Sequence, residues 1–174
     1  FYPDSSTFMD AWKILERYRI LNDTPKSILE YLQNGVAGTI EETPKPGSRY
    51  FDKVTNLILA SNKLALKAAA EKASKLGYTP VVMEKFIDGD VTSAAKMICS
   101  KIRSIRNESE KPVCLISGGE TTVNLGANPG VGGRNQELAL IASLELDGVE
   151  NIGFLSCGTD GTDGPTDAAG AIID

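Results

Sequence analysis

Three glycine-rich segments late in the chain hold the side chains whose types and spacing could do chemistry. They are residues 117–122, 126–137 and 157–167. In the first, Gly118 and Gly119 have no side chains, so their backbone amides can approach an anion closely, and Glu120 adds a carboxylate beside them. The segment is therefore a candidate phosphate or substrate site. Its structural alternative is a tight turn between two strands.

The second segment brings a basic residue to the start of a predicted helix. Gly132 and Gly133 precede Arg134 and Asn135, where helix amides carry partial positive charge and attract phosphate or carboxylate. Arg134 is the only lysine or arginine in 118–174, and its planar guanidinium suits a two-point grip on an oxyanion. The spacing fits neither a Walker A loop nor the dinucleotide fingerprint. It predicts an anion site, and the alternative is a flexible loop whose arginine pairs with a surface acid.

The third segment is acidic. Asp160 and Asp163 are candidate ligands for a divalent cation, with Asp167 nearby, because Mg²⁺ takes one or two carboxylates together with phosphate oxygens and water. Asp-Gly pairs also favour turns, and that alternative stays open. Residues 118–174 contain one arginine and nine acidic residues, a combination typical of a site for an anionic substrate together with a metal ion. Carboxylates alone would repel such a substrate, and a bound cation would offset that repulsion.

The composition excludes several kinds of site. The sequence has no histidine, which excludes serine–histidine triads, cysteine–histidine dyads and histidine-ligated zinc. The three cysteines are far apart and fit buried small hydrophobes better than a disulfide framework. A net charge of −5 argues against non-specific nucleic-acid binding, and no apolar run is long enough for a membrane span. We expect a cytoplasmic protein with a small-molecule partner.

Helices and strands alternate along most of the chain. The predicted helices are 7–19, 24–35, 61–76, 90–106 and 135–146, and the predicted strands are 54–60, 79–83, 113–116, 121–125 and 152–156. This pattern indicates an α/β fold, with a mostly parallel sheet flanked by helices and a short helical N-terminal segment. We expect residues 1–50 to form that helical segment and a proline-rich linker, and 51–174 to form the α/β domain.

The three segments together resemble the class II glycerate kinases. The motifs at 117–122, 132–139 and 158–170 follow the order of that family, and 3–8, 42–47 and 60–62 also look familial. The family phosphorylates glycerate to 2-phosphoglycerate with ATP and Mg²⁺, so the resemblance implies these cofactors and a C-terminal MOFRL-type domain in 51–174. It also implies a longer protein, in which residues 1–50 end an N-terminal domain that completes a cleft between the two domains.

The resemblance implies roles for particular residues. Arg134 would bind the substrate carboxylate or stabilise the transferring phosphoryl group, and Asp160 would contact the metal or a substrate hydroxyl. Asp163 is the second candidate metal ligand. The implied substrate- and phosphate-binding residues are Gly118, Gly119, Glu120, Gly132, Gly133, Asn135 and Asn62. The chain alone is then expected to lack kinase activity, and a homo-oligomer is compatible with it.

Two other functions stay open at this point. Some members of the family carry the older label hydroxypyruvate reductase, an activity that needs a nicotinamide cofactor. The missing dinucleotide fingerprint argues against it. The other alternative is a non-catalytic domain that binds an anionic metabolite.

Overall fold

The protein folds as two compact units. A computed structural model describes residues 2–174, and the chain divides into a first unit that ends at Leu59 and a second that runs from Ala60 to Asp174. Among the described residues, no helix is both long and apolar enough to cross a membrane.

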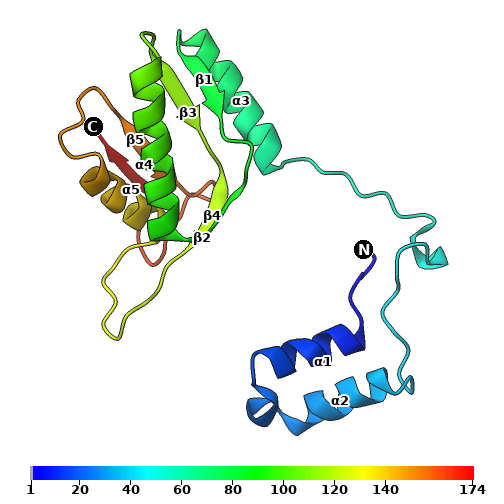
Figure 1. Cartoon of the computed structure of the whole chain (residues 1–174). Coiled ribbons are helices and arrows are strands. Elements are labelled where there is room, and N and C mark those ends of the chain that lie inside the picture. The colour runs from blue at the N-terminus through cyan, green and yellow to red at the C-terminus, as the bar shows by residue number, and fades with distance from the viewer. Residues whose placement is uncertain (1) are drawn as a thin grey trace. The chain divides into compact units, whose positions relative to one another are not determined.

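The first unit is a pair of helices followed by an irregular segment (Figure 1). Helix α1 spans Phe8–Arg17 and α2 spans Lys26–Val36, with 3₁₀ turns at Leu21–Asp23 and Arg49–Phe51. Both predicted helices are confirmed. The α1 N-terminus is closed by a capping box between Thr7 and Asp10.

One buried aromatic ring holds these two helices together. Phe8 is buried and meets Tyr31 edge-on, with ring centroids 5.5 Å apart. A Cβ at Gly35 would overlap the Phe8 ring, so α2 can approach α1 closely only with glycine at that position.

The strand predicted at 54–60 is wrong. These residues form neither helix nor strand, and Leu57, Ile58 and Leu59 are 78%, 80% and 88% exposed. An extended apolar run becomes a strand only when a neighbouring strand accepts its backbone hydrogen bonds. Nothing among the described residues pairs with this segment as a strand, and hydrophobicity alone did not reveal that.

The second unit alternates helices and strands. Its helices are α3 (Asn62–Lys75), α4 (Val91–Glu108) and α5 (Arg134–Glu145), and its strands are β1 (Thr79–Val82), β2 (Ile87–Asp90), β3 (Val113–Ile116), β4 (Gly119–Thr122), β5 (Phe154–Cys157) and β6 (Gly170–Ile173). The predicted α/β class is confirmed, as are the three helices. β4 lies at 119–122 instead of 121–125, and β2 and β6 were not predicted.

Two parallel strand pairs follow one another end to end in this unit. β1 pairs with β3 and β2 pairs with β4, and the backbone bonds Met83 N to Ile116 O and Ile87 N to Gly118 O join the two pairs end to end. β5 and β6 form a separate antiparallel pair. The pairing explains why β2 was missed: its sequence Ile-Asp-Gly-Asp has low strand propensity, and its partner β4 determines its conformation.

Small residues on α4 allow α5 to pack closely against it. Ala95 and Cys99 on α4 are fully buried, as is Ala142 on α5. Around them, one cluster centres on Ile87 and Ile98 and another on Cys99 and Leu146. This contact fixes the axis of α5, and with it the position of the helix N-terminus where Arg134 begins (Figure 1).

Candidate anion site at the start of α5

Asp163 caps the N-terminus of α5 from a distant loop. Its carboxylate accepts hydrogen bonds from the backbone amides of Asn135 at 3.0 Å and Gln136 at 2.8 Å, and from the Asn135 side chain at 3.1 Å. The residue is 2% exposed. Two amides that the sequence suggested for an outside anion are therefore occupied by a carboxylate of the chain itself.

Glycines make this approach possible. Gly133 is the N-cap of α5 and has no side chain to cap the helix, so an acceptor must come from elsewhere. A Cβ at Gly133 would overlap the carboxyl group of Asp163, and one at Gly164 would overlap the carbonyl of Gly132. Gly164 also has a φ of +62°, in the left-handed region that favours glycine.

Further polar side chains connect the same helix turn to its surroundings. Gln136 Nε2 donates to Thr166 Oγ1 at 3.0 Å, and the Ser156 hydroxyl donates to Asn135 Oδ1 at 2.8 Å. The sequence analysis singled out neither Gln136, Thr166 nor Ser156. The available signal was a helix start without a capping side chain, which requires polar partners from another segment.

The environment of Asp163 keeps its carboxylate ionised. Burial raises its pKa, but hydrogen bonds from the Asn135 and Gln136 amides and from both side chains outweigh that effect. The net result is a pKa below the ordinary value of 3.8. A fixed negative charge at a helix N-terminus also interacts favourably with the helix dipole.

Arg134 and Glu120 join the first glycine-rich segment to the second. Arg134 Nη1 lies 3.2 Å from Glu120 Oε1, and the two side chains are 45% and 66% exposed. The pairing of Arg134 with a surface acid, which the sequence analysis kept as an alternative, is present. The guanidinium is nevertheless open to solvent on a helix start whose backbone is clamped by Asp163.

The other residues of the first segment lie against α3 and β2. A Cβ at Gly118 would overlap the side chain of Asn62, the first residue of α3, and one at Gly119 would overlap the backbone carbonyl of Ile87. Protein atoms thus fill the space next to both glycines. The structure brings Asn62, Gly118, Gly119, Glu120 and Arg134 into one continuous row.

Asp160 makes its contact within its own loop. Its Oδ1 accepts a hydrogen bond from the Thr162 amide at 3.3 Å, and the side chain is exposed. Residues 2–174 contain no group of three or more acidic or cysteine side chains arranged to hold a metal ion. A cation here would need most of its ligands from a bound molecule or from water.

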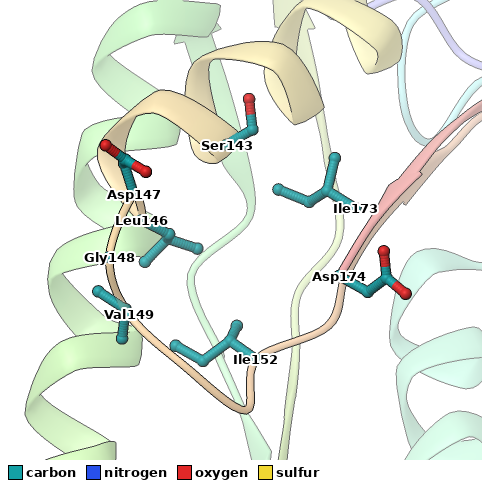
Figure 2. Close-up of a pocket in the computed structure, with 8 residues that line it drawn as sticks. All are labelled: Ser143, Leu146, Asp147, Gly148, Val149, Ile152, Ile173 and Asp174. Atoms are coloured by element: carbon teal, nitrogen blue, oxygen red, sulfur yellow. The ribbon is translucent and has the colours of Figure 1, made fainter.

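Two cavities are lined by other residues. One, of about 200 Å³, is lined by the end of α5, the following loop and β6 (Figure 2). It is separated from Arg134 by the length of α5, about 18 Å for 12 residues at 1.5 Å per residue. The other, of about 420 Å³, lies in the first unit beside Phe8 and Tyr31. The predicted site residues line neither cavity.

The MOFRL family matches residues 113–174. That range begins at β3 and includes all three glycine-rich segments. The clamp of Asp163 on α5 and the Arg134–Glu120 pair both lie inside the matched MOFRL region.

The similarity extends beyond the MOFRL region. The chain is 39% identical, over 98% of its length, to the glycerate 2-kinase of Pyrococcus horikoshii. The crystal structure of the glycerate kinase of Thermotoga maritima matches 99% of the chain at 37% identity, with a TM-score of 0.76. The chain spans 39% of the length of each of these proteins. A putative hydroxypyruvate reductase of Agrobacterium vitis is 35% identical over 98% of the chain, which spans 37% of that protein.

Proposed function

We propose that the chain is part of a glycerate 2-kinase, which transfers a phosphoryl group from ATP to glycerate and forms 2-phosphoglycerate. The observation that carries the proposal is the similarity over nearly the whole chain to proteins named glycerate 2-kinase and glycerate kinase. Arg134, the one basic residue of 118–174, has a side chain that is 45% exposed. An anionic substrate needs such a cation.

Arg134 is the residue proposed to act on the substrate. Phosphoryl transfer depends mainly on positioning and on neutralising the charge of the transferring group, so it requires no histidine. The guanidinium would bind the glycerate carboxylate or the transferring phosphoryl oxygens. Asp163 would act through Arg134, because it fixes the first turn of the helix from which that side chain extends.

Binding of a metal ion would depend largely on ligands supplied by the nucleotide. Asp163 uses both carboxylate oxygens on α5, so we assign it to positioning rather than to metal binding. Asp160 is exposed and could supply one carboxylate. Mg²⁺ commonly binds one or two carboxylates together with phosphate oxygens, and it would supply charge neutralisation at the phosphates.

The rest of the site would come from outside the 174 residues. The glycerate kinases matched here are more than twice as long as the chain, which spans 39% of them. We propose that a second domain closes the site, and that the chain alone has little kinase activity. We further propose a cytoplasmic enzyme that acts on a small molecule, with no nucleic-acid or membrane partner, and self-association is a property to be measured.

A chimera tests the proposal directly. The chain would replace the matching 39% of the Thermotoga maritima glycerate kinase, and 2-phosphoglycerate would be measured with D-glycerate, ATP and Mg²⁺. We expect turnover in the ordinary range for enzymes, about 1–10³ s⁻¹, from the chimera and almost none from the 174-residue chain. A folded chimera without turnover would contradict the proposed function, and full turnover by the chain alone would contradict the need for a second domain.

A substitution in the chimera then tests the role of Arg134. Arg134→Lys keeps the charge but removes the planar donor fork, so we expect kcat to fall about 10²-fold. Arg106→Lys is the matched control, because Arg106 is exposed on α4 and forms no hydrogen bond or ion pair with the row of site residues. Equal kinetics for the two variants would remove Arg134 from the mechanism.

Reduction of hydroxypyruvate is the second candidate, favoured by the name of the Agrobacterium vitis relative. Oxidation of NADH by the same chimera in the presence of hydroxypyruvate, followed by absorbance, separates the two reactions. If the chimera catalyses neither reaction but calorimetry detects glycerate binding to the chain, the non-catalytic binding domain is favoured.

A further inference from the structure

Among the described residues, Glu120 is the one carboxylate that contacts Arg134. The ion pair uses a single guanidinium nitrogen, Nη1, at 3.2 Å. Among residues 2–174, no other side-chain partner of Arg134 is found. Most of the donor fork therefore remains available while Glu120 is bound. A carboxylate or phosphate that engages two donors would form a stronger contact than this single-atom pair.

The backbone prevents both partners from moving far apart. Arg134 extends from the helix turn that Asp163 clamps, and Glu120 extends from the centre of β4, which is paired along its length with β2. The two side chains are 45% and 66% exposed, so their attraction is weak and readily exchanged. An incoming anion can therefore break the ion pair between Glu120 and Arg134, but the Glu120 carboxylate remains close to the guanidinium and can return to it.

A second carboxylate increases the repulsion. Asp88 on β2 is the register partner of Glu120 on β4, and register partners of parallel strands place their side chains on the same face of the sheet. Asp88 has no ion-pair partner among the described residues. When Glu120 loses its contact with Arg134, its charge is left beside the like charge of Asp88. This repulsion opposes the displacement of Glu120 from Arg134.

We infer that Glu120 is an internal competitor for Arg134, which an anionic ligand must displace. This inference rests on the proposed function, in which the ligand carries a carboxylate or a phosphate. The consequence is selectivity. Anions that present two oxygens to the guanidinium replace Glu120, whereas anions that engage one donor gain nothing over the resident carboxylate. Glu120, predicted from sequence to bind substrate, would instead set the affinity threshold for it.

The test measures anion binding to the 174-residue chain by calorimetry, with D-glycerate and inorganic phosphate as probes. Glu120→Gln removes the competing charge and preserves the shape, so we expect binding about two- to fivefold tighter than wild type. Arg134→Gln should weaken binding at least about tenfold. Asp88→Asn is the matched control: it removes one charge from the neighbouring strand without contacting Arg134, and its effect should be smaller than that of Glu120→Gln.

Each outcome decides the inference. Equal or weaker binding by Glu120→Gln overturns it, because a weaker complex would mean that Glu120 orients Arg134 for the ligand. An equal gain from Asp88→Asn would also overturn it, since general charge would then explain the effect. Absence of binding by every folded variant, with folding checked by circular dichroism, counts against it as well.

The chimera separates this inference from the proposed function. There, Glu120→Gln should lower the KM for glycerate with little change in kcat, because the competitor acts only on binding. If the chimera phosphorylates glycerate but this KM is unchanged, only the inference fails. If the chain binds anions more tightly after Glu120→Gln but the chimera lacks kinase activity, only the proposed function fails.

Discussion

Two glycine-rich segments, one before and one after α5 in the sequence, have similar glycine content. The first is loosely packed and the second is tightly packed. Residues 126–133 and 158–170 each contain four glycines. In the first, Gly126, Gly130 and Gly132 have no atoms near the position of a Cβ, and Val131 is 84% exposed. In the second, Gly158 and Gly164 lie tightly against backbone, and Asp163 is 2% exposed.

The difference shows that glycine content alone does not identify a ligand site. In 158–170 the glycines allow close approach of protein to protein, so that Asp163 can reach the amides of Asn135 and Gln136. In 126–133 only the last glycine, Gly133, has such a role. The decisive feature is a buried acceptor matched to donors that lack a partner of their own.

The largest expected effect comes from removing that acceptor. Asp163→Ala leaves the two α5 amides without their carboxylate, and we expect the free energy of unfolding of the second unit to fall by about 3 kcal/mol. Amide hydrogen exchange at Asn135 and Gln136 measures the loss directly. Asp167→Ala, an exposed acid in the same loop, should change stability by less than about 0.5 kcal/mol.

An internal control is available for this comparison. Trp12, the only tryptophan, lies in α1 of the first unit, so its fluorescence follows that unit alone. We expect its unfolding curve to be the same in wild type and Asp163→Ala. If Asp163→Ala and Asp167→Ala are equally stable, the buried Asp163 carboxylate does not stabilise the second unit.

Local signals in the sequence predicted most of the helices. Thr7 with Asp10, Ser61 and Asp90 are capping residues that identify helix starts without any tertiary information, and all three cap helices in the structure. Strands depend on partners, which explains the errors. Residues 54–60 have a strand-like sequence, but no strand among the described residues pairs with them, whereas β2 has a poor strand sequence and pairs with β4.

For the candidate site, the sequence indicates residues but does not indicate the contacts between them. Arg134 stands out because it is the only cation in an acidic region, which is a property of composition. Its pairing with Glu120 and the clamp by Asp163 join segments 14 to 28 residues apart, as the positions 120, 134, 135 and 163 show. Spacing along the chain carries no information on such contacts, so Asp163 was interpreted as a metal ligand when its geometry is that of a helix cap.

Substitutions of glycine test the same comparison, with smaller expected changes in the unfolding free energy. Gly133→Ala places a methyl group where the Asp163 carboxyl lies, so we expect a loss of about 1–3 kcal/mol in the unfolding free energy. Gly130→Ala meets no neighbouring atoms, and its change should be neutral or stabilising by up to about 1 kcal/mol. Chemical denaturation of both variants gives the two values. A loss at Gly130 as large as that at Gly133 would mean that the first segment is packed as tightly around Gly130 as around Gly133.

The dependence of stability on pH is the smallest expected effect, and it is specific for the ionised carboxylate of Asp163. Because the folded-state pKa of Asp163 lies below its ordinary value of 3.8, the ionised carboxylate stabilises the fold above that pH. The contribution is lost as the pH falls from 3.8 through the lower folded-state pKa. Asp163→Asn removes this titration, so the stability difference between wild type and variant should stay constant above about pH 5 and shrink at lower pH. Hydrogen exchange of α5, measured at several pH values, follows the second unit without interference from Asp4 in the first, whose pKa is lowered to about 2. A difference that stays constant down to pH values well below 3.8 would show that the bonds to Asn135 and Gln136 do not require a charged carboxylate.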